Sequence, residues 1–318
     1  MAQPTKTNTA ACVCGLIKPM ATRFSSTLLA DNAADANFRA WAQFIEDTLV
    51  TTGGWLVTSD SGQTLPSALV HPTTTSQKMG YRVYQMNDAL QATVPVFMRI
   101  DFGSSSGTAA APAIWVTVGT GSNGSGTITG IMMNAVQMNS AGNSSQANNS
   151  YGSAAPNRVA IALFCQNVTG IRLVFTLERS KDVNGNDTGA GLLCIYNSTA
   201  TWLESSRYLN YATAGVVQPS VELGLSYVLT TQNPSQSFAP GDIGVAVVSC
   251  IRGVAQQPGL NVMIVPSGDV GDQGQFSMNI YGAAHTYQQI SSQCIVQKAL
   301  CNANRLADNN ARACIRYD

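Results

Sequence analysis

The sequence predicts a mainly β protein, in which an antiparallel β-sandwich or jelly-roll-like region follows an N-terminal arm and one amphipathic helix. Three observations predict this fold class. Apolar residues recur at helical spacing in one segment near the N-terminus, from Asp31 to Val50. After Gly54, short β-rich runs alternate with Gly, Asn, Pro and Ser at spacings of about 10–15 residues. These runs do not alternate with helical patterns, which argues against a parallel sheet.

The N-terminal segment divides into an arm and a helix. Residues 1–30 show no clear periodicity, so we expect an extended arm. Phe38, Trp41, Ile45 and Leu49 then follow at three- and four-residue steps and form one apolar helix face. Two interpretations stay open: this face packs on the chain's own β region, or it docks on a neighbouring subunit. We take the four residues as a candidate interface.

Both ends of this helix carry recognisable signals. Asp31, Asn32 or Asp35 can cap its start, because a side-chain oxygen there can accept a bond from a free amide of the first turn. Gly53 and Gly54 end it, since glycine readily adopts the conformation that terminates a helix.

The remaining chain contains a series of short segments with the composition of strands. We expect strands at Trp55–Thr58, Tyr81–Met86, Val96–Phe102, Ala113–Val118, Thr127–Met138, Arg158–Cys165, Gly170–Arg179, Ala190–Tyr196, Gly224–Leu229, Ile243–Arg252, Asn261–Val265 and Gln275–Tyr281, with a last one at Ala313–Tyr317. A short helix is expected around Ile295–Leu300.

A low-complexity segment of Asn, Ser, Ala and Gly, Asn139–Asn157, interrupts this series and is expected to be a long loop. The sequence thus predicts two regions, an arm and helix over residues 1–52 and a β-sandwich region over residues 53–318. The second region can divide into two sub-domains near residues 139–157.

The balance of charge excludes several classes of partner. Lys and Arg together number 17, as do Asp and Glu, and only 11% of residues are charged, against about 25% in an ordinary soluble domain. A chain so poor in basic residues is not expected to bind nucleic acid or an acidic membrane surface. It has no apolar run of about 18 residues, so no membrane insertion is expected. Such a surface suits contact with other protein.

Cysteine and acidic residues give no metal or cofactor site. The eight cysteines lack the paired spacing of a zinc site, and we expect them to be mostly reduced and structural. The segment Asp182–Asp187 resembles the start of a calcium loop, but position 193 is Leu where a bidentate Glu is needed. Its Asn-Gly pair instead predicts a hairpin turn. Gly119–Gly124 has the spacing of a dinucleotide loop, but a β-like segment follows it.

Catalytic residues are also scarce. The two histidines, His71 and His285, have no Cys, Asp or His nearby at ligand spacing, and no nucleophile elbow of the form G-x-S-x-G is present. Spatially assembled triads leave no mark in a sequence, so hydrolysis remains a third alternative. We expect that the protein is not an enzyme.

Three aromatic residues suggest a glycan-binding alternative. Trp202, Tyr208 and Tyr211 are close in sequence and lie beside Glu204 and Arg207, which can bond hydroxyl groups. Aromatic rings on strands more often belong to a core or an interface. They are candidate stacking residues for a receptor-binding adhesin that recognises host-surface glycan.

One part of the chain resembles virion-associated proteins of tailed bacteriophages. The resemblance spans roughly residues 35–130 and lies in five stretches. They are Arg39–Glu46 (RAWAQFIE), Gly53–Trp55 (GGW), Thr58–Thr64 (TSDSGQT), Gly80–Gly103 (GYRVYQMNDALQATVPVFMRIDFG) and Pro112–Gly121 (PAIWVTVGTG).

This resemblance implies a structural virion protein associated with a tail, neck, fibre or baseplate. Its partners would be copies of itself and other virion proteins, and its place of synthesis the host bacterial cytoplasm. No catalytic residue, cofactor or metal ligand is carried over by it. It agrees with the surface composition, which favours burial against protein.

Overall fold

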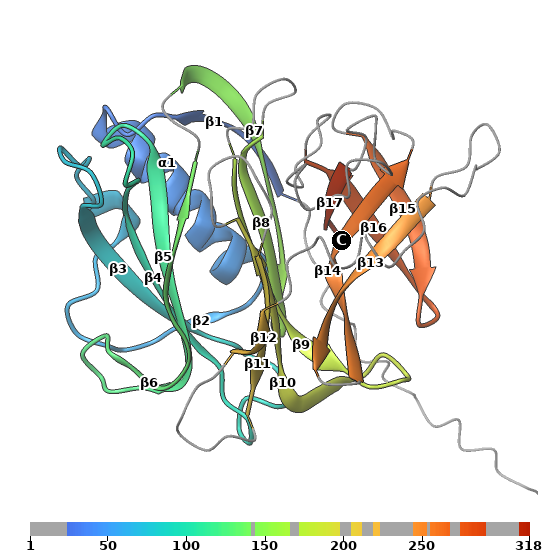
Figure 1. Ribbon diagram of the computed structural model, residues 1–318. Coiled ribbons are helices and arrows are strands. Elements are labelled where there is room, and N and C mark those ends of the chain that lie inside the picture. Colours follow the sequence, from blue (N-terminus) through green and yellow to red (C-terminus); the bar gives the residue numbers. More distant parts are fainter. Residues whose placement is uncertain are drawn as a thin grey trace, which may run out of the picture.

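The computed structural model describes residues 24–140, 144–165, 172–197, 205–211, 219–222, 244–252, 255–267, 274–290 and 312–318. It confirms the predicted fold class: the protein is mainly β, with three antiparallel sheets and one helix near the N-terminus (Figure 1). The strand expected at Gly224–Leu229 and the short helix at Ile295–Leu300 lie outside the described residues.

Each sheet consists of strands that are consecutive in the chain, with one exception. The first strand joins the sheet formed by the seventh to twelfth strands. The seven-stranded sheet has the order β1 (Phe24–Ala30), β7 (Ser144–Ala155), β8 (Arg158–Cys165), β9 (Leu173–Lys181), β10 (Asp187–Tyr196), β11 (Ser205–Asn210) and β12 (Pro219–Glu222). One five-stranded sheet has the order β2 (Leu56–Val57), β3 (Lys78–Gln85), β4 (Phe97–Ser104), β5 (Pro112–Ser122) and β6 (Ile128–Asn139). The other has the order β13 (Gly244–Arg252), β14 (Ala255–Ser267), β17 (Arg312–Arg316), β16 (Ala283–Gln289) and β15 (Gln275–Ile280).

The helix has two parts and ends as predicted. α1 (Asp35–Glu46) continues into a π-helical segment, η1 (Asp47–Thr52), and Gly53 forms its C-terminal cap. The expected side-chain cap at the start is wrong, because Ala34 occupies the cap position without a side-chain bond. The three polar residues proposed for that role bond elsewhere: Asp31 to the Ala33 amide, Asn32 to the Trp41 ring and Asp35 to the His71 amide.

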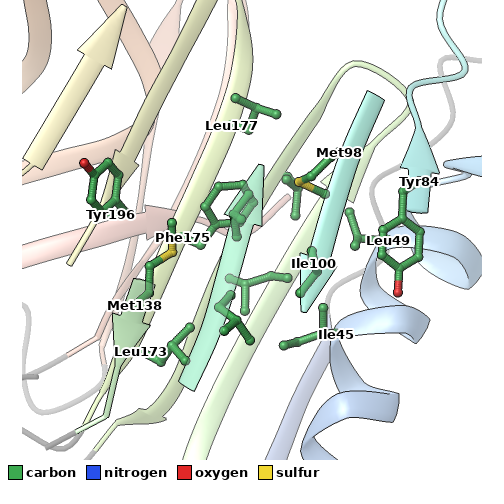
Figure 2. Close-up of a cluster of buried hydrophobic side chains, with 14 of the residues drawn as sticks. Ile45, Leu49, Tyr84, Met98, Ile100, Met138, Leu173, Phe175, Leu177 and Tyr196 are labelled. Carbon is green, nitrogen blue, oxygen red and sulfur yellow. The ribbon is translucent and has the colours of Figure 1, made fainter. Parts of the chain in front are cut away.

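The helix lies between the β2–β6 sheet and the seven-stranded sheet, as Figure 1 shows. Figure 2 shows the resulting core, where Ile45 and Leu49 of the helical segment lie near Ile100 of β4, and Phe175 of β9 joins the same cluster. Burial of this apolar area from two sheets and one helix face stabilises the fold, at about 25 cal/mol per Å² removed from water.

The seven-stranded sheet is the central layer and is covered on both faces. The third sheet packs on the face opposite the helix, with β14 against β9 and β17 against β8. As a result β8 is buried along its entire length, and β9 along all but its last residue. Val159 and Ile161 of β8 face the helix core, while the alternate residue Arg158 faces the third sheet.

β7 corrects the expected loop at Asn139–Asn157, because Ser144–Ala155 forms a strand in the central sheet. It pairs with β1, formed by the last described part of the expected arm. Its small residues let the helix approach closely: a Cβ at Gly152 would collide with the Thr48 side chain. The sheet contacts described here do not test the proposed division at residue 52 or near residues 139–157, which stays a prediction.

Candidate functional site

The four residues predicted as an interface belong to the chain's own core. Phe38, Trp41, Ile45 and Leu49 have no exposed surface. The Trp41 ring packs edge-on against Phe38, with centroids 5.1 Å apart. Their expected role as docking residues for a neighbouring subunit is therefore corrected, because no part of these side chains remains free for a partner.

Of the three predicted glycan-stacking residues, the structure describes Tyr208 and Tyr211, and both are held by contacts within the chain. Trp202 lies outside the described residues. Tyr208 is buried, and its ring closes over Gly191. The hydroxyl of Tyr211 donates to the carbonyl oxygen of Pro95 at 3.1 Å, and burial raises its pKa to about 12. Tyr208 and Tyr211 thus serve packing and hydrogen bonding within the chain.

Both histidines are engaged in pairs with acidic residues distant in sequence. Nδ1 of His71 lies 2.6 Å from Oδ1 of Asp35, and the His71 amide also donates to that oxygen. These bonds lower the pKa of Asp35, that from the amide most strongly. Nδ1 of His285 lies 3.2 Å from Oδ2 of Asp318. Sequence spacing concealed both pairs, because the fold brings the partners together across elements.

The Asp182–Asp187 segment is a hairpin turn between β9 and β10, as its Asn-Gly pair predicts. Oδ1 of Asp182 accepts bonds from the amides of Asn184 and Asn186, each at 2.8 Å. Lys181 and Asp187 form an ion pair across the base of the turn. The carboxylate oxygens of Asp182 and Asp187, which suggested a calcium site, thus bond to groups of the turn itself.

An ionic clamp joins the helix to the β2–β6 sheet. Nε and Nη2 of Arg82 donate to the two carboxylate oxygens of Glu46 at 2.8 and 2.9 Å. The hydroxyl of Tyr84 donates to the same carboxylate at 3.1 Å. Burial raises the pKa of Tyr84 well above its ordinary value, as does the neighbouring Glu46 charge.

A second clamp with buried charge joins the central sheet to the third sheet. Oε1 of Glu178, on β9, accepts hydrogen bonds from the amides of Leu260 and Asn261 on β14, both at 2.8 Å. Among the described residues, Oε2 of Glu178 and Oδ1 of Asn261 have no hydrogen-bond donor. Burial raises the pKa of Glu178. A neutral carboxyl group at this position can donate a bond as well as accept two.

Arg158 extends this clamp and lies opposite Glu178 on the neighbouring strand. Its guanidinium group donates to Oγ of Ser153 at 3.1 Å and to the main-chain oxygen of Asp318 at 2.5 Å. Burial lowers the pKa of Arg158 to about 9. Burial raises the pKa of Asp318, but bonds from His285 and Arg316 outweigh it and hold the pKa below its ordinary value.

Sequence reasoning did not single out this buried polar layer. A weak signal was present: the β9 sequence LVFTLERSK places Glu178 and Arg179 inside a run of strand-forming residues. Arg179 is fully buried and pairs with Asp88, with Nη2 2.8 Å from Oδ1. Buried charges are rare without such partners, so charges within an apolar strand indicate a layer contact.

The outer face of the β2–β6 sheet carries two cation–aromatic stacks. The Arg99 guanidinium lies 3.8 Å from the Tyr81 ring centroid, and the Lys78 ammonium lies 5.1 Å from the Trp115 ring centroid. Asp101 joins both cations, at 2.6 Å from Arg99 and 3.5 Å from Lys78. These groups satisfy one another, so the cluster orders this face of the sheet.

The described part of the chain contains neither a candidate metal site nor a helix that could span a membrane. Its His, Cys, Asp and Glu side chains form no group of three or more that could hold a metal ion. No helix within the described ranges is both long enough and apolar enough to span a membrane. In comparisons with known proteins, no family model matches the chain, and no curated protein or solved structure is significantly similar to it.

Proposed function

We propose that this chain is a structural component of a tailed-phage virion, in which it acts by self-assembly and by docking to other virion proteins. The observation that carries the proposal is the resemblance of residues 35–130 to virion-associated proteins. In the fold this segment is continuous: it forms the helix, the strands β2 to β5 and the start of β6.

The side chains that carry the resemblance have packing roles. Glu46 of the first stretch and Arg82 of the fourth form the helix–sheet clamp. Trp55 donates from Nε1 to the carbonyl oxygen of Ala155 on β7, at 2.9 Å. A resemblance built on such residues supports a shared scaffold, which is what a structural protein contributes.

The engagement of charges supports a non-enzymatic role. His71, His285, Glu46 and Glu178 each have a partner within the chain. A general acid or base must reach a substrate proton, and the carboxyl groups of Glu46 and Glu178 are mostly buried and bonded to partners within the chain.

The proposal is tested in purified particles of the phage that encodes the chain. We expect mass spectrometry to find the chain in a fixed ratio to the major structural proteins, and immunogold labelling to place it at one location on the particle. A chain that is abundant in the lysate and absent from washed particles would contradict the proposal.

The adhesin alternative has its own experiment. A glycan array probed with the parent chain and with Trp202→Ala would show binding that the substitution removes, if this residue stacks on a sugar. Tyr208→Ala is unsuitable as a binding probe because Tyr208 is buried. The hydrolase alternative predicts sugars or peptides released from host envelope by the parent chain. We expect neither activity.

A further inference from the structure

The edges of the three sheets differ in how they are protected against pairing with another chain. An edge strand exposes unpaired amide and carbonyl groups, and natural proteins block it with short length, charge, proline or bulges. The described sheets end in six edge strands: β1 and β12, β2 and β6, and β13 and β15.

Four of these edge strands carry a blocking feature. β2 has two residues. β12 has four and contains Pro219 and Glu222. β6 shifts register twice against β5, and β13 shifts twice against β14. Such irregularities bend a strand and interrupt the flat ladder that a new strand would need.

The edge strands β1 and β15 are longer than β2 and β12 and contain no charge and no proline. Only one register shift occurs in them, at the C-terminal end of β1 between Leu29 and Ala30. β15 pairs regularly with β16 over all six residues. β1, with the sequence FSSTLLA, has no charge and no proline and pairs regularly with β7 from Phe24 to Leu29. β1 belongs to the central sheet, which holds the main core, and Leu28 packs partly buried at the margin of that core. An added strand at β1 would complete the cover of this side chain.

We propose that two copies of this chain pair through β1, antiparallel about a two-fold axis, so that their central sheets form one continuous sheet. The inference rests on the self-assembly in the proposed function and names its partner and surface. A two-fold axis at Thr27, the middle residue of β1, places this residue opposite its copy. Cross-strand threonine pairs are favourable. With no charge on the strand, self-pairing brings no like charges together.

The chemistry of the edge favours a second copy over a charged partner. A strand that recruits a basic or acidic peptide carries complementary charge, whereas β1 offers hydroxyl and aliphatic groups. The exposed side chains of Ser25 and Thr27 alternate with the partly buried Ser26 and Leu28. About this axis Thr27 lies opposite Thr27 of the second copy, Ser26 opposite Leu28, and Ser25 opposite Leu29.

The experiment measures the oligomeric state of the full chain by light scattering and sedimentation over about a hundredfold range of concentration. We expect the parent to form dimers. Thr27→Lys and Thr27→Glu alone should each raise the dimer dissociation constant at least about tenfold, because like charges then face each other. An equimolar mixture of the two variants should dimerise again. Thr129→Lys, on the exposed face of the bulged edge strand β6, is the matched control and should dimerise as the parent does.

Several outcomes would overturn the inference. They are a monomeric parent, a Thr27→Lys variant that dimerises as well as the parent, or a mixture that does not recover. Thermal melts of each variant identify loss of folding, and recovery in the mixture cannot come from unfolded chains. This result is independent of the virion proposal. A chain that is monomeric but present in particles would contradict only the β1 pairing. A chain that dimerises but is absent from particles would contradict only the proposed function.

Discussion

Glu178 of β9 and Asn261 of β14 are joined by a hydrogen bond of 2.8 Å from the Asn261 amide to the buried Glu178 carboxyl. The same oxygen also accepts the Leu260 amide. One acidic side chain therefore satisfies two consecutive main-chain amides of a different sheet. These two hydrogen bonds link the central sheet directly to the main chain of the third sheet.

Two substitutions at Glu178 should separate the loss of its hydrogen bonds from the loss of its ionisable group. Glu178→Ala leaves two buried amides without a partner, at about 1–3 kcal/mol each. Glu178→Gln retains an acceptor oxygen and adds a donor, so we expect it to lie within about 1 kcal/mol of the parent. Urea denaturation followed by circular dichroism measures both. Equal loss in the two variants would show that the hydrogen bonds contribute little.

The pH dependence of stability should carry the signature of Glu178. Burial raises its pKa above the ordinary 4.5, so the folded chain keeps a proton that the unfolded chain releases. Its contribution is fully present below about pH 4.5 and is lost as the pH rises through the folded pKa. Thermal melts across this range should show the parent falling relative to Glu178→Gln. Asp318, whose pKa is lowered, contributes in the opposite direction below pH 3.8, equally in both chains. A constant difference between the two chains would contradict the prediction.

The helix–sheet clamp should be more sensitive than a surface pair. Arg82→Ala strands the Glu46 carboxylate, which is mostly buried, and should cost about 2–4 kcal/mol. Arg39→Ala breaks an ion pair with Asp35 whose side chains are each more than a third exposed, and should cost less than about 1 kcal/mol. Denaturation midpoints compare the two variants directly. Similar losses would mean that burial does not set the strength of this clamp.

Truncation of the helix face should affect stability and leave assembly unchanged. Trp41→Ala removes a fully buried ring between the sheets and should cost about 3–5 kcal/mol. The folded fraction should keep the oligomeric state of the parent, because Trp41 has no free surface. A Trp41→Phe variant, which retains an aromatic ring, allows that state to be measured if Trp41→Ala does not fold. A changed oligomeric state in the folded Phe variant would restore the interface hypothesis.

Alanine variants at two turn glycines should show how much the contact between the hairpin turn at Gly185 and Tyr281 contributes to stability. Gly185 and Gly124 share positive φ angles of 83° and 82°. A Cβ at Gly185 would lie 2.5 Å from the Tyr281 ring, whereas nothing lies within 4 Å at Gly124. Each Ala variant pays the backbone strain of about 1 kcal/mol, and Gly185→Ala adds the displacement of the ring. Thermal melts should rank Gly185→Ala below Gly124→Ala, and equal melting temperatures would show that the ring moves freely.

The sequence predicts a strand correctly where its pattern of apolar residues matches the pattern of buried side chains. It does not predict a strand that is buried for another reason. β4 alternates apolar and polar residues and was predicted, and so were β8 and β9. The sequence predicts a loop where β7 lies, because Ser, Asn and Gly are poor strand formers. β7 is a strand because it lies between β1 and β8, and its small residues admit the helix.

The burial of the predicted interface residues within the chain has a related cause. Helical spacing at Phe38, Trp41 and Ile45 shows that one face is buried, but the same spacing results from burial in a core or against a neighbour. The pairing of Glu178 with β14 depends on contacts across more than 80 positions. No short-range pattern encodes a contact of that separation.

The unequal protection of the central sheet limits how far it can grow. Because β12 is only four residues long and contains Pro219, the proposed pairing leaves this sheet one edge at which a strand can be added, β1. A two-fold pairing uses that edge in both copies at once, so growth along the sheet stops at two. The proposed pairing would join two copies by sheet extension without starting a fibre. Any larger ring must then be closed through other surfaces of the pair.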